Sequence, residues 1–194
     1  MSLKLFAQIV SRIFDFPLWV TILLSVALFN TGLSASQIKI MGPLLVVVDV
    51  IAPIVIFLIL LRDGDISDID ITRRRERYKL FGFGSVASFI SCFFVYFLGN
   101  HQFFALFATG FVITATLFLI TLKWKISGHM IINCTGIYIL SYLFEWQFLW
   151  LFALIPFVAF ARFYLKKHSL WQITAGGVLG LLEPYVFLKL FNVI

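Results

Sequence analysis

Charged residues are scarce in this sequence. They make up 12% of the 194 residues, whereas hydrophobic residues make up 62%. A soluble domain has about a quarter charged residues and about half apolar ones. The shortage of charge therefore excludes an ordinary soluble domain and predicts a protein that lies in a lipid bilayer.

Cysteine is nearly absent, and regular polar alternation is lacking as well. The two cysteines, Cys92 and Cys134, both lie inside apolar stretches, so they provide neither a disulfide framework nor a metal-ligand spacing. The apolar runs do not alternate with polar residues, which excludes a transmembrane barrel. Helices can span a bilayer because they satisfy their own backbone hydrogen bonds. We expect one all-α, polytopic integral-membrane domain over residues 1–194.

Long apolar runs, in contrast, are abundant. With about 20 apolar residues for each crossing, the sequence predicts a bundle of about six to seven spanning helices. The fifth and sixth segments are short, which indicates helices that enter obliquely or begin in the interface. The seven segments are Phe16–Leu33, Pro43–Leu61, Leu80–Leu98, Phe103–Leu122, His129–Leu143, Gln147–Ala161 and Ser169–Leu188.

Basic residues outnumber acidic ones by 15 to nine, but they lie at the ends of the apolar segments. They form no basic arm, so we expect no nucleic-acid partner. If seven helices cross, all but two of the 15 basic residues fall on the side of the N-terminus. Only Lys39 and Lys189 lie on the other side. The positive-inside rule makes the basic side cytoplasmic, which predicts a multi-pass protein of the cell (inner) membrane.

A first histidine motif lies at a boundary on this predicted cytoplasmic side. Ser127, Gly128 and His129 open a helix shortly after Lys123 and Lys125. A hydroxyl, a glycine that lets the backbone approach closely and the free amides of a helix start form an anion site. The histidine is positioned there to transfer a proton. The same serine and glycine would also serve as an ordinary helix cap.

A second histidine motif begins with Arg162 and continues with His168 and Gln172. Gln172 lies one turn beyond His168 on the same helix face, where its amide can fix which ring nitrogen faces a substrate. Gly176 and Gly180 continue this face at the same spacing and allow another helix to approach closely. The two histidine motifs are therefore expected to meet across the bundle.

The connection between the second and third segments carries an acidic and a basic cluster. Arg74 and Arg77 are candidates for binding phosphate oxygens through their paired donors, or else anchor the chain to anionic headgroups. The aspartates of Asp63–Asp70 could ligate a hard cation, but the glycine and the final glutamate of a calcium loop are missing. We expect no bound metal and no other cofactor.

Two further polar residues lie apart from these motifs. Asp49 lies inside the second apolar segment, where an acid is costly and often functional. It is remote from the histidine motifs, so a hydrogen-bonded structural role explains it at least as well. His101 lies in a connection on the non-cytoplasmic side, and we assign it no function.

The two histidine motifs together resemble those of a known family. Arg162, five residues, His168 and a polar residue four positions further resemble the third motif of the type 2 phosphatidic acid phosphatase superfamily, Ser-Arg-x5-His-x3-Asp. Ser127-Gly128-His129 resembles the second motif of that superfamily, Pro-Ser-Gly-His. The order and spacing of the two motifs agree with the family, and the resemblance covers roughly residues 65–180.

The first motif of the superfamily, Lys-x6-Arg-Pro, matches least well. If Arg77 is its arginine, then Asp70 takes the position of the lysine and Tyr78 that of the proline. Arg73 or Arg74 is then a candidate to supply the missing cation. Gln172 also departs from the family, because an amide cannot stabilise an imidazolium as the aspartate would.

The resemblance implies a hydrolase that removes a phosphomonoester or diphosphate from a membrane lipid without a metal. It implies that His168 attacks phosphorus and forms a phosphohistidine, that Gln172 orients this ring, and that His129 protonates the leaving alcohol and later activates water. It implies a set of residues that hold the phosphoryl oxygens. These are Ser127, Gly128, Arg162 and Arg77, with Arg74 and Lys123 as further candidates.

Two other functions fit part of the sequence. A magnesium-dependent prenyl or alcohol phosphotransferase would use Asp65, Asp68 and Asp70 to hold the metal and a diphosphate, but it would need a second acidic motif. A non-catalytic membrane protein would use the same motifs to bind a lipid headgroup. In all three cases the partners are a lipid phosphate and the bilayer, and the sequence leaves the oligomeric state open.

Overall fold

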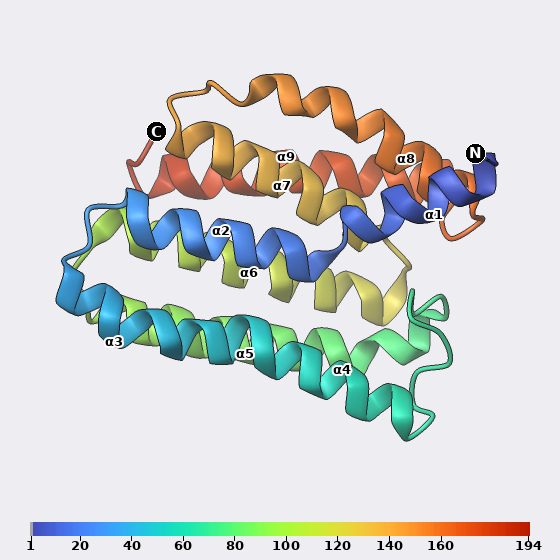
Figure 1. Cartoon of the computed structure of the whole chain (residues 1–194), viewed down its shortest axis with the longest axis horizontal. Coiled ribbons are helices and arrows are strands. Elements are labelled where there is room, and N and C mark those ends of the chain that lie inside the picture. Colours follow the sequence, from blue (N-terminus) through green and yellow to red (C-terminus); the bar gives the residue numbers. More distant parts are fainter. Residues whose placement is uncertain (1) are drawn as a thin grey trace.

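The computed structural model describes residues 2–194, and these residues form helices and connections with no strand. The helical segments run back and forth along one axis, with α1 continuing into α2 and α3 into α4 in the same direction before the chain reverses (Figure 1). A π-helical segment, η1, joins α3 to α4, and a 3-10 segment, η3, precedes α8. The bounds are α1 Leu3–Ile13, α2 Phe16–Asn30, α3 Ala35–Leu45, η1 Val46–Ile51, α4 Ala52–Arg62, η2 Arg74–Glu76, α5 Arg77–Tyr96, α6 His101–Lys123, α7 Gly128–Leu143, η3 Leu149–Leu154, α8 Ile155–Tyr164 and α9 Leu170–Leu190.

Among the described residues, five helical segments are long and apolar enough to cross a bilayer. The predicted all-α membrane bundle is confirmed, although the sequence predicted six to seven spanning helices and the structure has five that are long and apolar enough. The difference comes from the two short segments: α7 has 16 residues, which is about 24 Å, against about 30 Å of hydrocarbon. The five segments are Leu3–Asn30, Ala35–Arg62, Arg74–Tyr96, His101–Lys123 and Leu170–Leu190.

Helix α1 was not predicted. Its polar residues recur every three or four positions, at Lys4, Gln8, Ser11 and Arg12, so they form one stripe on an otherwise apolar helix. The helix packs on α8, where the ring of Phe6 meets two phenylalanine rings. The amphipathic period gave a signal, but the segment is too short and too polar to be read as a spanning helix.

Helices α7 and α9 are parallel and unusually close. The structure confirms the predicted role of Gly176 and Gly180, because a Cβ atom at Gly176 would lie 2.7 Å from the carbonyl oxygen of Ser127, and one at Gly180 would lie 2.5 Å from that of Ile131. Such distances exclude any larger residue without movement of the backbone. The close packing sets the starts of the two helices side by side.

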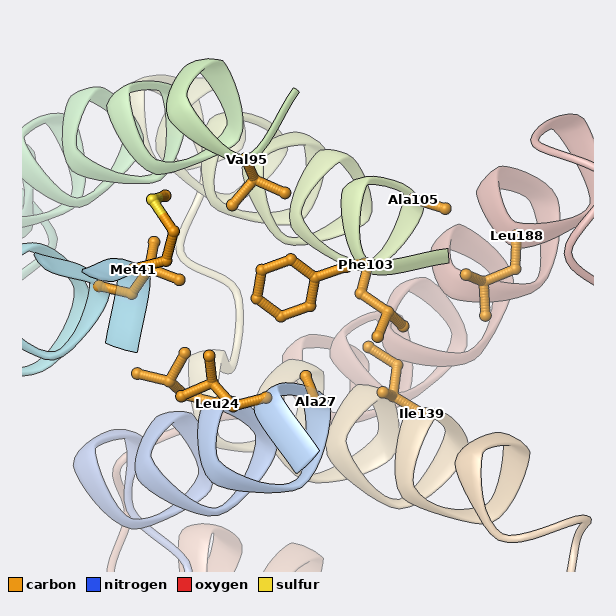
Figure 2. Close-up of a cluster of buried hydrophobic side chains, with 11 residues drawn as sticks. Leu24, Ala27, Met41, Val95, Phe103, Ala105, Ile139 and Leu188 are labelled. Atoms are coloured by element: carbon orange, nitrogen blue, oxygen red, sulfur yellow. The ribbon is translucent and has the colours of Figure 1, made fainter. Parts of the chain in front are cut away.

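The largest apolar cluster lies toward the other end of these helices. In Figure 2 the ring of Phe103, which is fully buried, is surrounded by side chains from several helices, among them Met41, Val95 and Ile139. This cluster joins α2, α3, α5, α6, α7 and α9. At the opposite end, where α1 meets the α4–α5, α6–α7 and α8–α9 connections, smaller apolar clusters lie beside buried polar side chains (Figure 1).

Candidate functional site

His168 lies in the short connection between α8 and α9, with only 6% of its surface exposed. Its Nδ1 atom is 3.2 Å from Oε1 of Gln172. The same oxygen accepts the backbone N–H of Ser169 at 3.2 Å, which identifies it as the acceptor end of the amide. Nδ1 must therefore carry the proton of the neutral ring, and Nε2 keeps a free lone pair. Gln172 thus fixes the tautomer as the sequence predicted.

The charges of three cations act on this imidazole. Burial, together with the charges of Arg77, Arg162 and Lys125, lowers the pKa of His168 to about 2. The ring is therefore uncharged at neutral pH. A neutral imidazole with Nε2 unprotonated is the form that can attack phosphorus.

Arg162 is the most deeply buried cation of the group, at 1% exposure. Its Nη1 atom donates to Oγ of Ser11 at 2.5 Å and to Oδ1 of Asp70 at 3.2 Å. Its Nε atom is buried and has no hydrogen-bond partner within residues 2–194. A buried guanidinium donor without an acceptor is costly, so this nitrogen is suited to bind an anion.

The hydroxyl oxygen of Ser127, like Nε of Arg162, is buried and has no hydrogen-bond partner among the described residues. The side chains of Ser34, Asn100 and Ser169 cap their helices by accepting backbone N–H groups. Ser127 precedes α7 in the same way but makes no such bond, and its fully buried Oγ atom has no partner in the described chain. The backbone N–H of Ser127 instead donates to the carbonyl oxygen of Gln172, at 3.2 Å.

Gly128 and His129 are the first residues of α7, so their backbone N–H groups have no helical partner. The Nε2 atom of His129 lies 3.3 Å from the carbonyl oxygen of Ser11 and 3.5 Å from Oδ1 of Asp15. Burial and the charge of Arg162 lower the pKa of His129, although the carboxylates of Asp15 and Asp70 partly oppose this effect, so this ring is also neutral at neutral pH. Ser11 therefore links the two motifs: its carbonyl oxygen lies against His129 of the first motif, and its hydroxyl accepts from Arg162 of the second.

Arg77 is also buried, at 4% exposure. Its Nε and Nη1 atoms donate to the carbonyl oxygens of Ile71 and Ile126, at 2.8 and 3.1 Å. These bonds hold the α4–α5 connection against the residue that precedes Ser127. The charge of Arg77 acts on His168, while two of its donors are used by backbone carbonyls; its predicted contact with phosphate stays a prediction.

Asp70 brings a carboxylate into this cationic group. Although its burial raises the pKa, a hydrogen bond from Lys167 and the charge of Arg162 outweigh this effect and lower the pKa of Asp70 to about 2. The Nζ atom of Lys167 lies 3.0 Å from Oδ2. The acid therefore stays ionised and holds Arg162 and Lys167 together.

Two predicted phosphate-binding residues are not brought into this group. Arg74 donates to the carbonyl oxygens of Thr121 and Leu122 and to the hydroxyl of Tyr78, so it caps the C-terminus of α6. Lys123 lies exposed in the last turn of α6. Arg73, the other candidate for the missing cation of the first motif, pairs with Glu76 at 3.4 Å.

The structure adds two cations, Lys125 and Lys167, to the residues that the sequence predicted for the site. Lys125 donates to the carbonyl oxygen of Lys167 at 2.6 Å, and its charge acts on His168. Ser11 and Asp15 are also additions. No family motif contains them, and the sequence offered no signal for Ser11 and Asp15 because their contacts span more than a hundred residues.

The acidic connection does not gather its carboxylates at one point. Asp65 pairs with Lys79 at 2.6 Å, whereas Asp70 pairs with Arg162 and Lys167. No group of three potential metal ligands occurs among residues 2–194. Far from this end, Asp49 accepts a hydrogen bond from Ser91 at 2.6 Å, in line with a structural role.

This end of the bundle therefore combines a neutral imidazole, a second imidazole beside a carboxylate, and buried donors without acceptors. Such a set can bind a tetrahedral anion, attack it and move a proton. No protein-family model, curated protein or solved structure matches the chain.

Proposed function

We propose that this membrane protein is a lipid phosphate phosphatase that hydrolyses a phosphomonoester or diphosphate through a phosphohistidine, without a metal. The observation that carries the proposal is the pair of buried, unpartnered atoms, Nε of Arg162 and Oγ of Ser127, on residues that backbone hydrogen bonds of 3.3 and 3.2 Å join to His168 and to Gln172. Its motifs resemble those of the type 2 phosphatidic acid phosphatase superfamily, and this resemblance supports the same reaction.

The phosphoryl group would be bound by donors that lack a partner in the protein. Arg162 and Ser127 would each donate one hydrogen bond, and the free amides of Gly128 and His129 would contribute the field of a helix N-terminus. Arg77 and Lys125 would add positive charge close to His168. Together these groups stabilise the charge that spreads over the phosphoryl oxygens in the transition state.

In the first step, Nε2 of His168 attacks phosphorus, and the bond between phosphorus and the leaving oxygen breaks. The negative charge of the bound phosphate favours the protonated form of His129, which takes up a proton from water when the substrate binds. His129 gives this proton to the leaving oxygen, so the lipid leaves as a neutral hydroxyl or as a protonated phosphate. In the second step, His129 takes a proton from water as the water oxygen attacks the phosphohistidine. Inorganic phosphate leaves, and both imidazoles return to their starting state.

The departures from the family motifs have local compensations. Gln172 accepts the Nδ1 proton of His168, so the nucleophile is oriented although no carboxylate stabilises it. Lys125 and Lys167 supply cations near the phosphate position, in place of the lysine of the first motif. The predominance of basic residues at this end of the bundle favours a site on the cytoplasmic face of the cell membrane.

The test is phosphate release by the purified protein in the presence of a chelator, with phosphatidate, phosphatidylglycerol phosphate and a polyprenyl phosphate as substrates. We expect His168→Ala to abolish turnover and His129→Ala to lower it by about 10²- to 10⁴-fold. His101→Ala is the matched control, because this ring lies at the opposite end, 2.5 Å from the carbonyl oxygen of Phe191.

Turnover by the His168→Ala variant at the wild-type rate would refute the mechanism. Strict dependence on magnesium would favour the phosphotransferase alternative. Binding of these lipids without any hydrolysis would favour a non-catalytic headgroup-binding protein. An acid-labile phosphoenzyme in the wild type that is missing from the His168→Ala variant would identify the nucleophile.

A further inference from the structure

A cavity of about 350 Å³ lies beside the proposed phosphate site. The polar stripe of α1 forms one wall, with Lys4, Gln8, Ser11 and Arg12. Asp70 and Lys167 contribute from the connections opposite. Its volume is in the range of ligand cavities, and its α1 wall lies outside the three family motifs.

This cavity adjoins the site on the side of His129. Ser11 lines the cavity, its hydroxyl accepts from Arg162 at 2.5 Å, and its carbonyl oxygen lies 3.3 Å from Nε2 of His129. Displacement at phosphorus is in line, so the leaving oxygen departs opposite the attacking nitrogen. If His168 attacks and His129 protonates, the leaving group emerges next to Ser11, at the mouth of the cavity.

The acidic group of the cavity is already paired, whereas the two basic groups of α1 are not closely paired. Asp70 is already paired with Arg162 and Lys167, at 3.2 and 3.0 Å. Lys4 forms no salt bridge within residues 2–194, and Arg12 lies no closer than 3.8 Å to an acidic oxygen. Both α1 cations are therefore available to an anion that enters from the side of His129.

The outer face of α1 fits a lipid. Leu5, Ile9 and Ile13 are exposed on this helix, while Lys4 and Arg12 line the cavity. An amphipathic helix of this kind lies at the boundary between headgroups and acyl chains. A lipid beside it would leave its chains against the apolar face and place its polar group in the cavity.

We infer that this cavity is a subsite for an anionic leaving group, so that the substrate carries a second phosphate between the scissile phosphate and the lipid chains. The shared chemistry is a phosphate on the leaving group, as in a prenyl diphosphate or in phosphatidylglycerol phosphate. A lipid such as phosphatidate, whose leaving group is a neutral alcohol, uses the phosphate site without this subsite. The inference rests on the proposed function.

The experiment compares kcat/KM within two substrate pairs that share their chains. One pair is a prenyl diphosphate and the prenyl monophosphate, and the other is phosphatidylglycerol phosphate and phosphatidate. We expect wild type to prefer the member with the anionic leaving group by about tenfold or more in at least one pair, and the pair that shows it identifies the source of the second phosphate.

Lys4→Glu should reduce this preference at least tenfold, and Lys4→Arg should restore it. Lys4 is exposed, so the substitution should leave the fold intact. Lys39→Glu, at the opposite end of the bundle, is the matched control for the same change of charge and should leave the preference unchanged. Equal kcat/KM within both pairs, or a preference that Lys4→Glu does not alter, would overturn the subsite while phosphatase activity stands.

If no substrate is hydrolysed, binding separates the two ideas. The wild-type protein is then titrated with a prenyl methylenediphosphonate and with the matching monophosphonate. Tighter binding of the diphosphonate that is lost in Lys4→Glu supports the subsite although the proposed reaction has failed. Equal affinity for both lipids rejects the subsite as well.

Discussion

The ammonium group of Lys125 lies half-buried among cations, at the edge of the site. Burial, with the charges of Arg77, Arg162 and Lys167, lowers the pKa of Lys125 to about 8. Lys125 is therefore charged below this pH and loses its proton as the pH rises above it. Its contribution to phosphate binding is present at neutral pH and absent in alkaline solution.

We expect kcat/KM for phosphate release to fall on the alkaline side, with a midpoint near pH 8. Lys125→Arg should move this decline to higher pH, because a guanidinium keeps its proton there. Lys123→Arg is the matched control and should keep the midpoint of the wild type, since Lys123 is exposed and outside the group. A midpoint that Lys125→Arg leaves unchanged would assign the titration to another group.

Asp70 explains how several cations can lie close together in the site. Its carboxylate contacts Arg162 and Lys167, and removing a partner from a buried charge is strongly destabilising. With a pKa of about 2, Asp70 stays charged at every pH at which the protein would be assayed. The acid at the position of the family's lysine therefore organises the cations around the site.

At the scale of elements, the site depends on the packing of α7 against α9. His129 lies in the first turn of α7, and His168 directly precedes the N-cap of α9. The two helices are parallel, so their N-termini lie at the same end. Gly176, against Ser127, and Gly180, one turn further, let them approach closely enough for the backbone N–H of Ser127 to reach Gln172.

Gly180→Ala should separate the two helices. The new methyl group would lie 2.5 Å from the carbonyl oxygen of Ile131, so backbone must move. We expect a loss of about 1–3 kcal/mol in stability, a lower melting temperature in detergent, and a loss of phosphate release. Gly84→Ala is the matched control, because nothing lies within 4 Å of a Cβ atom there. Wild-type stability and activity in Gly180→Ala would show that the close packing is dispensable.

Helix α1 and the break that follows it bring N-terminal residues into the candidate site. It supplies Ser11 to Arg162, its break before α2 leaves Asp15 beside His129, and its polar stripe closes a cavity. Asn133 helps to hold this arrangement, because its amide joins α7 to the ring of Trp19 and to the backbone of Phe14. The N-terminal segment is thus part of the candidate site as well as part of the membrane anchor.

At the scale of the whole molecule, the two ends of the bundle differ in chemistry. One end combines the candidate site with most of the Lys and Arg residues, and the other packs the large apolar cluster around Phe103. Such asymmetry sets the orientation of a membrane protein. The site should therefore face the cytoplasm.

This orientation is tested with single cysteines in a background that lacks Cys92 and Cys134. Asp63→Cys marks the site end and Ser36→Cys the opposite end, and both positions are exposed. A membrane-impermeant maleimide should label Ser36→Cys in intact cells and Asp63→Cys only in inverted vesicles. The reverse pattern would put the site on the outer face.

The fold class followed from the sequence because it depends on the length of the apolar runs alone. Apolar runs of bilayer length must form helices, since no water is present to satisfy exposed backbone groups. Each of the seven predicted segments overlaps an observed helix, and the spacing of Gln172, Gly176 and Gly180 predicted one face of α9. His168 was expected on the same helix, but it lies just before the N-cap Ser169; its pairing with Gln172 was predictable because the two residues are only four positions apart.

Only the tertiary structure decided which distant side chains share the site. Arg74 and Lys125 are both basic residues near apolar boundaries, yet Arg74 caps α6 while Lys125 lies beside His168. Ser11 and Asp15 reach their partners from the other end of the chain. Sequence pattern determines which residues can enter a membrane and which face of a helix they share. The packing of helices determines which charges are buried together, and with them the chemistry of the site.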